Sequence, residues 1–170
     1  SVRREGSVSY VRYIDKTREY YESEGYARAY EWAHFETIPF TPFTALGKPL
    51  AQCRVGLVSS GDVVRCDIEL PADDPRRLVY SLPADLPVDR YQSRKAAYDR
   101  YATTLEDADS FLPLTQLRRL AAEGVIGSVA SRLQVIASEY SQRKTLTVDA
   151  PEILGQMRED GVDVAFLAAV

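Results

Sequence analysis

Small polar residues follow the first predicted strand of the chain, where they could hold a ligand. The apolar, β-branched run that begins at residue 54 ends in Ser59, Ser60, Gly61 and Asp62. Such a run is typical of a short buried strand followed by a tight loop, whose hydroxyls and backbone amides could face a crevice. It contains neither a G-x-G-x-x-G fingerprint nor a P-loop. The alternative is a structural turn with no ligand.

A second polar group follows the strand predicted over 133–137. Tyr140, Ser141 and Arg143 lie in the polar segment 138–144. A guanidinium can bind a carboxylate through two parallel hydrogen bonds, so Arg143 would suit an amino-acid-like or other anionic substrate. The same residue would also fit a solvated helix start.

A third polar group lies in the stretch 83–110, which reads as a long loop with local helix. Lys95, Tyr98 and Asp99 could form a polar cluster there. Solvated loop residues are the alternative interpretation of these three side chains.

Other catalytic chemistry is limited by one histidine and two cysteines. His34 lies beside Trp32 in an aromatic segment without a nucleophile elbow, so we expect a packed structural histidine rather than a catalytic triad. Cys53 is expected to be a small buried residue, whereas Cys66 could be a reactive thiol. No disulfide framework, zinc site or other metal site is predicted.

The elements that must position these groups alternate between strand and helix. Strands are predicted over 54–61, 77–82, 133–137 and 162–170, and helices from Pro113 to Gly124 and from Pro151 to Gly161. This alternation predicts an α/β fold, a three-layer Rossmann-like domain with a mostly parallel sheet and helices on both faces. Ligands bind such sheets at the carboxyl ends of the strands, so the three polar groups are expected to meet there.

The N-terminal part of the chain has a different composition. Residues 1–36 are rich in tyrosine and charge and predict two helices, and the prolines of 39–44 predict an extended segment. We therefore expect a helical, aromatic-rich arm over 1–50 that packs on an α/β domain over 51–170. That domain is expected to be incomplete at its C-terminus, because Val170 lies within an apolar run. An uncovered side of the sheet would favour association with a partner subunit or with further copies.

Charge and hydropathy exclude several other classes. The formal net charge is −4, so a basic nucleic-acid-binding surface is not expected. No apolar run approaches the ~18 residues of a membrane helix, and no apolar signal-peptide region is visible. With so few cysteines, the expected location is the reducing cytoplasm.

Short segments spread over almost the whole chain form a set that is specific in its order and spacing. They are 13–18, 20–21, 25–26, 30–34, 41–43, 48–50, 54–59, 80–85, 98–99, 112–117, 123–127 and 160–165. In this order and spacing the chain resembles the selenoprotein B family of glycine, sarcosine, betaine and D-proline reductases. The resemblance implies a subunit or fragment of an oxidoreductase in amino-acid metabolism, with a small-molecule substrate and a hetero-oligomeric partner.

The family cleaves a carbon–nitrogen bond reductively with a cysteine or selenocysteine, which follows the strand matching 164–170. A helix start lowers a thiol pKa, which suits such a residue. By resemblance, the thiol would be supplied just after Val170 or by a partner chain. A pyruvoyl group on an adjoining chain is a further possibility that the resemblance implies. No cofactor is expected within these residues.

Two departures from the family leave the substrate open. Lys95 replaces a frequent histidine, and 138–143 replaces a glycine-rich turn. A non-catalytic structural or regulatory subunit and a small-molecule binding module are therefore the alternative functions.

Overall fold

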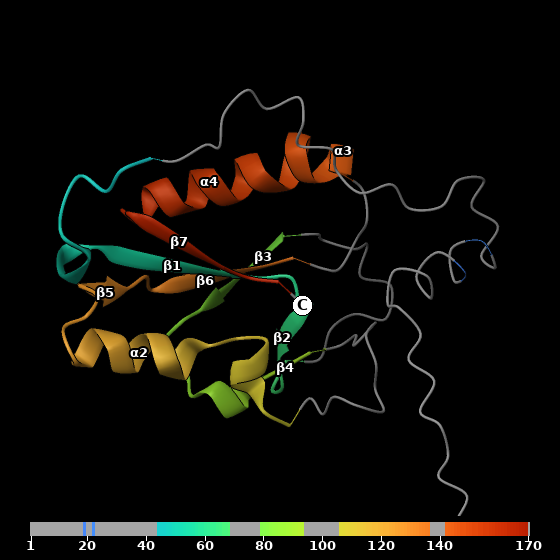
Figure 1. Ribbon diagram of the computed structural model, residues 1–170. Coiled ribbons are helices and arrows are strands. Elements are labelled where there is room, and N and C mark those ends of the chain that lie inside the picture. The colour runs from blue at the N-terminus through green and yellow to red at the C-terminus, as the bar shows by residue number, and fades with distance from the viewer. Residues whose placement is uncertain are drawn as a thin grey trace, which may run out of the picture. The chain divides into compact units, whose positions relative to one another are not determined.

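The computed structural model describes residues 19, 22, 44–68, 79–93, 106–136 and 142–169. Most of the predicted arm, including His34, lies outside these residues, so its packing and its boundary at residue 50 stay predictions. The described residues from 44 onward belong to one compact unit, Thr44–Val170. They form a mixed α/β structure, as expected (Figure 1).

Within the described residues, the main sheet has five strands and is mostly parallel. Its central strand β1 pairs in parallel with β5 and β6 and, on its other side, with β7. The sheet is not wholly parallel, because β3 pairs with β6 in the antiparallel sense. The strands are β1 (Arg54–Ser59), β3 (Val79–Pro83), β5 (Ser128–Val129), β6 (Arg132–Ile136) and β7 (Val164–Ala168).

A two-stranded antiparallel sheet pairs β2 with β4, and β4 lies within the stretch 83–110 that was expected to be a loop. Three-residue strands carry too short a pattern to be seen in the sequence, which explains why both were missed. These elements and the short helices beside them are β2 (Val63–Arg65), η2 (Leu50–Gln52), η3 (Val88–Arg90), β4 (Tyr91–Ser93) and η4 (Ala108–Ser110).

The two longer described helices begin and end where their prolines and glycines predict. Helix α2 (Leu114–Ala122) follows Pro113, and helix α4 (Ala150–Glu159) has Pro151 in its first turn. Gly124 and Gly161 follow them with φ of 72° and 65°, a left-handed conformation that glycine adopts without a steric penalty. Short α3 (Gln142–Lys144) and η5 (Thr145–Asp149) lead into α4.

The two helices lie on opposite sides of the sheet (Figure 1). Val55 and Leu57 of β1 belong to the same buried cluster as Leu114 and Leu117 of α2. On the other face of β1, Met157 of α4 packs against Gly56. A Cβ atom at Gly56 would lie only 3.0 Å from the Met157 methyl carbon, so a larger residue would crowd this contact. Strand β1 therefore packs on both faces, which accounts for its unbroken apolar sequence.

Candidate functional site

The carboxyl ends of β1, β6 and β7 meet at one edge of the sheet, as parallel strands require (Figure 1). The loop after β1 touches both neighbours there. The Ser60 amide donates to the Ala168 carbonyl at 3.1 Å, and the Asp62 amide donates to the Ile136 carbonyl at 3.3 Å. The expected meeting of these strand ends is therefore confirmed, and the loop 60–62 lies at its centre.

Ser59 anchors the loop from inside the protein. Its side chain is fully buried, and its hydroxyl donates to the Phe111 carbonyl at 2.6 Å. The same oxygen accepts the Gly61 amide at 3.2 Å. Ser59 therefore fixes the backbone of the loop, in which Gly61 is also buried and Ser60 is half-buried.

Asp62 is a buried carboxyl at this edge, with 2% of its surface exposed. Its φ of 47° is in the left-handed region, which is uncommon outside glycine but is tolerated by aspartate. Strained backbone of this kind concentrates at functional sites, where the surrounding structure holds it in place.

Ser93 at the end of β4 was not anticipated from the sequence. Its hydroxyl donates to the Gly61 carbonyl at 2.6 Å, so the β2–β4 sheet is fastened to the loop. Lys95, Tyr98 and Asp99 follow Ser93 in the chain and lie outside the described residues. The hydrogen bond of Ser93 places the described end of β4 at the carboxyl edge.

The approach of α4 brings Arg143 to the same end of the sheet. Gln156 of α4 accepts a hydrogen bond from Ser81, which lies midway along the outer strand β3 and opposite Gln134 of β6. Helix α4 begins six residues before Gln156, about 9 Å along its axis, whereas β6 ends only ~7 Å beyond Gln134. The start of α4 therefore extends past the carboxyl end of β6. Arg143, in α3, is exposed beyond that edge, whereas Tyr140 and Ser141 lie outside the described residues.

Asp149 is a second buried carboxyl that the sequence did not single out, with 3% of its surface exposed. It immediately precedes α4 and therefore lies at the end of that helix nearest the site. Its backbone is helical and continuous with α4, and its side chain makes no capping hydrogen bond, so Asp149 is a buried carboxyl within a helical segment rather than a helix cap.

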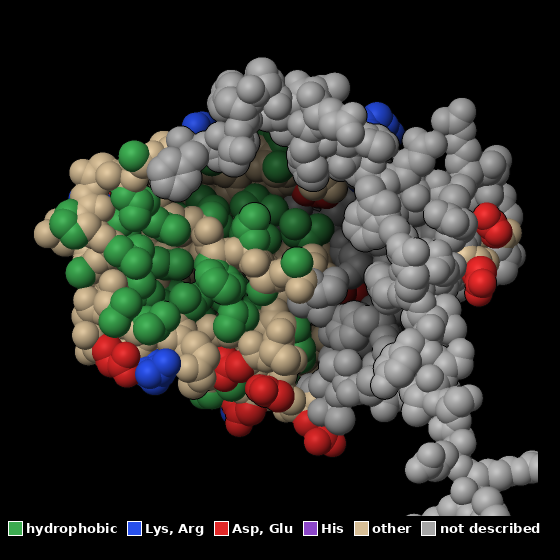
Figure 2. Space-filling view, in the orientation of Figure 1, with side chains coloured by type: hydrophobic (Ala, Val, Ile, Leu, Met, Phe, Trp, Pro, Cys, Tyr) green, Lys and Arg blue, Asp and Glu red, His purple; other side chains and the backbone are tan. Residues whose placement is uncertain are grey.

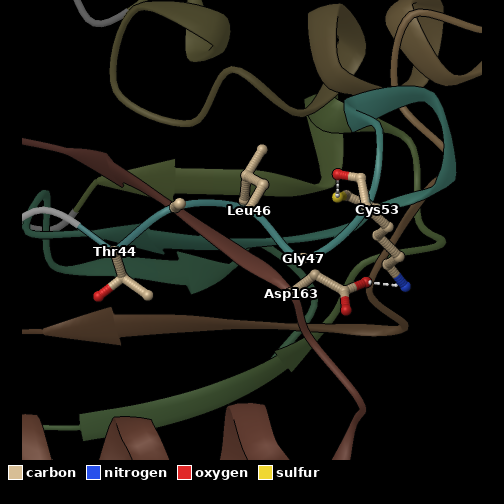
Figure 3. Close-up of a pocket in the computed structure, with 7 residues that line it drawn as sticks. Thr44, Leu46, Gly47, Cys53 and Asp163 are labelled. Carbon is tan, nitrogen blue, oxygen red and sulfur yellow. Dashed lines mark hydrogen bonds and ion pairs between the residues drawn. The ribbon is translucent and has the colours of Figure 1, made fainter.

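The amino edge of the sheet, at the opposite ends of the same strands, contains a cavity of about 360 Å³. Figure 3 shows Cys53 and Asp163 at this cavity; they directly precede β1 and β7. The cavity is lined by Thr44, Ala45, Leu46, Gly47, Lys48, Cys53 and Asp163.

The charges around this cavity are paired with one another. Lys48 Nζ lies 2.7 Å from Asp163 Oδ2 (Figure 3). The same oxygen accepts the Arg54 amide at 2.8 Å. These hydrogen bonds hold the pKa of the Asp163 carboxyl below its usual range, first through Lys48 and then through the Arg54 amide. Because its charged groups stabilise each other and α/β sheets bind ligands at the other edge, we assign the cavity a structural role.

The two cysteines lie in different places: Cys53 precedes β1, and Cys66 follows β2, whose sheet is fastened to the loop 60–62. Cys53 is fully buried at the amino edge, where its thiol donates to the Pro49 carbonyl, which confirms the expected buried residue. Cys66 is exposed, directly after β2. Its neighbours Arg65 and Asp67 form an ion pair of 2.6 Å with each other, and the Arg65 hydrogen bond lowers the pKa of the Asp67 carboxyl.

Among the described residues, no helix has the length and apolar character needed to cross a membrane. Within the same residues, no three histidine, cysteine or acidic side chains gather closely enough to hold a metal ion.

Comparison with known proteins agrees with the family resemblance. The chain is 29% identical over 139 residues to the D-proline reductase subunit gamma of Acetoanaerobium sticklandii, covering 78% of this chain and 56% of that protein. It is 26% identical over 160 residues to the glycine reductase complex component B subunit gamma of Symbiobacterium thermophilum, covering 87% of this chain and 35% of that protein. The chain thus spans about half of the first relative and about a third of the second.

No solved structure matches the chain significantly. Residues 9–170 match the profile of the family described as glycine/sarcosine/betaine reductase selenoprotein B. Since this match covers nearly the whole sequence, the chain belongs to the glycine/sarcosine/betaine reductase selenoprotein B family.

Proposed function

We propose that this chain is part of a thiol- or selenol-dependent reductase complex and that its carboxyl edge binds a small amino-acid-like substrate. The observation that carries the proposal is the meeting of three strand ends around the loop 60–62, with two buried carboxyls, Asp62 and Asp149, at that edge. The relatives' names add support, since both are subunits of amino-acid reductases. A Rossmann-like fold and a cytoplasmic location belong to the same proposal.

The charges of the edge suit a zwitterion. A carboxylate such as Asp62 attracts an ammonium group, and the exposed guanidinium of Arg143 can bind a carboxylate through two hydrogen bonds. Ser60 and Gly61 would supply polar contacts between these two ends. Lys95, Tyr98, Asp99, Tyr140 and Ser141 would complete the site from the neighbouring segments.

The reductant would come from outside these 170 residues. Cleaving a carbon–nitrogen bond reductively takes two electrons and two protons and releases an amine, while a thiol or selenol pair is oxidised. Cys53 is buried at the opposite edge and Cys66 is a lone exposed thiol after β2, so these residues supply no thiol pair at the carboxyl edge. We therefore assign the reactive group to a residue after Val170 or to a partner chain, on which a pyruvoyl group is a further possibility.

A second candidate function is a non-catalytic subunit that completes an active partner. The observation that favours it is that the two cysteines form no thiol pair at the carboxyl edge. A binding module without redox chemistry would share this feature. Substrate binding separates a substrate-binding subunit from the non-catalytic roles. A chain that contributes to the substrate site should bind the substrate by itself, or its substitutions should change the affinity of a complex for the substrate.

Calorimetric titration of the purified chain with glycine, betaine or D-proline tests the proposal. We expect Arg143→Ala to weaken the binding of glycine and D-proline by about tenfold to a hundredfold, the usual cost of losing a charge-assisted pair. Arg158→Ala, an exposed arginine on α4 toward the amino edge, is the matched control and should leave the affinity unchanged. Equal affinity of the wild-type and Arg143→Ala proteins would remove Arg143 from the site, and no binding of any of the three compounds would favour the non-catalytic subunit.

A further inference from the structure

The end of helix α4 at the amino edge is fastened to the sheet by several contacts. Asp160, directly after the helix, pairs with Arg132 of β6, and its carbonyl accepts a hydrogen bond from the Arg54 guanidinium at 2.6 Å. Met157, near this end of the helix, is buried against β1. This end of α4 is therefore fixed in position.

The segment before α4, at the carboxyl edge, is mostly exposed. From residue 143 to residue 155, Asp149 is the only buried residue. Leu146 is 73% exposed and Val148 is 52% exposed, which is unusual for apolar side chains of a helix. Figure 2 shows basic side chains at the surface close to α3, the part of this segment that contains two basic residues. Packing therefore holds the segment mainly at Asp149, where it joins α4.

The helical hydrogen bonding is irregular at this junction. The Ala150 amide donates to the Thr145 carbonyl, five residues back instead of four, which makes η5 a π-helical turn. Pro151 has no amide hydrogen, so a further backbone hydrogen bond is missing there. The Thr147 hydroxyl donates to the Arg143 carbonyl at 2.8 Å, a contact that often bends helices. Because helices kink at π turns and prolines, this helix bends most easily where η5 joins α4.

We propose that α3 and η5 form a lid, which bends at its junction with α4 and closes over the substrate site. The start of α4 extends past the carboxyl end of β6, so the segment before it lies beyond that edge (Figure 1). A lid in this place would exclude water and retain the substrate during the reaction. The inference rests on the proposed function, because it assigns a closing movement to the same substrate site.

The substrate carboxylate would drive the closure. A ligand shifts a conformational equilibrium only through contacts that it makes better in one state than in the other. Arg143, in α3, is exposed, so its paired hydrogen bonds to a carboxylate would form as the lid closes. Closure would also remove apolar surface of Leu146 from water. A compound that has the amine of a substrate but no carboxylate should therefore leave the lid open.

Two nitroxide labels can measure this closure in the purified chain. One label is attached to Cys66, which is exposed and follows β2, and the other to Thr145→Cys in the lid, while Cys53 is fully buried and does not react. We expect the label-to-label distances, measured by double electron–electron resonance, to be broadly distributed in the free protein. Saturating D-proline should shorten and narrow them, whereas pyrrolidine, which lacks the carboxylate, should not. Leu154→Cys, exposed on α4 after the bend, is the matched control and should give one narrow distribution throughout.

Pro151→Ala tests the bend itself. The new amide can donate a helical hydrogen bond, so the distance distribution of the free Thr145→Cys protein should narrow. A distribution in the free protein as narrow for Thr145→Cys as for Leu154→Cys would overturn the proposal. Distances that do not change when calorimetry shows D-proline bound would also overturn it. Self-association that Leu146→Lys abolishes would assign the exposed side chains to a contact between copies instead. The breadth in the free protein needs no substrate, so failure of the lid and failure of substrate binding are distinguishable.

Discussion

The two edges of the sheet differ in how their polar groups are used. At the amino edge, charged side chains pair with one another: Arg132 contacts Asp160 at 2.6 Å and Glu159 at 2.7 Å, and Lys48 contacts Asp163. At the carboxyl edge, Ser59 and Asp62 are buried, and backbone amides of the loop bind the ends of neighbouring strands. The amino edge thus stabilises the fold, whereas the carboxyl edge holds polar groups in positions that a ligand could use.

The largest expected effect lies at the amino edge. A Cβ atom on Gly127 would lie 2.7 Å from the Gln52 carbonyl carbon and 2.9 Å from the Cys53 carbonyl oxygen. Because backbone atoms would have to move, Gly127→Ala should lower the free energy of unfolding by about 3 kcal/mol, the upper end of the usual overpacking cost. Urea denaturation measures this change.

Gly155→Ala is the control for that substitution. No atom lies within 4 Å of a Cβ at Gly155, in the exposed part of α4, so the helix should gain up to about 1 kcal/mol. A Gly127→Ala protein as stable as wild type would show that the amino edge tolerates movement and would weaken the contrast between the edges.

A smaller effect is expected at the carboxyl edge from Ser59→Ala. The substitution leaves the Phe111 carbonyl and the Gly61 amide without the Ser59 oxygen, in a site closed to water. The free energy of unfolding should fall by about 1–2 kcal/mol, measured by urea denaturation, and substrate affinity should fall with it as the loop loosens. Ser110→Ala, which removes a hydroxyl from an exposed hydrogen bond, should change stability by at most about 0.5 kcal/mol. Comparable losses for the two variants would argue against a special role of Ser59.

The smallest effect is a dependence on pH at the amino edge. The Asp163 carboxyl has a pKa below its unfolded value, because Lys48 and the Arg54 amide favour its charged form. Its contribution to stability is therefore present above the unfolded pKa and is lost as the pH falls through the folded pKa. Titration of Asp163 followed by NMR should show the lowered pKa, and Lys48→Met should move it back toward the usual value. A carboxyl that titrates normally in the wild-type protein would contradict the ion pair.

Much of the α/β body could be predicted because its signals are local. Pro113 and Pro151 indicate helix starts, Gly124 and Gly161 indicate helix ends, and the apolar run from residue 54 indicates a buried strand. The antiparallel direction of β3 could not be predicted, since it depends on pairing with β6 far along the chain. The short strands β2 and β4 carry too few residues for a periodic pattern.

The candidate site was predictable only in part. Ser59 to Asp62 were identifiable because small polar residues directly follow a strong strand signal. Ser93 and Asp149 were missed, since their roles depend on tertiary contacts: Ser93 binds the Gly61 carbonyl, and Asp149 is buried although the segment around it is mostly exposed. The pairing of Lys48 with Asp163, separated by more than a hundred residues, likewise has no local sequence signal.

The central claim is that a small amino-acid-like substrate binds at the carboxyl edge of this sheet. The most direct test follows the backbone amide signals of the isotopically labelled protein by NMR during titration with glycine, betaine or D-proline. We predict shifts at Ser60, Gly61 and Asp62 that saturate together, with the signals of Gly47 and Lys48 at the amino-edge cavity unchanged. Shifts confined to Gly47 and Lys48 would contradict the account and assign binding to the opposite edge.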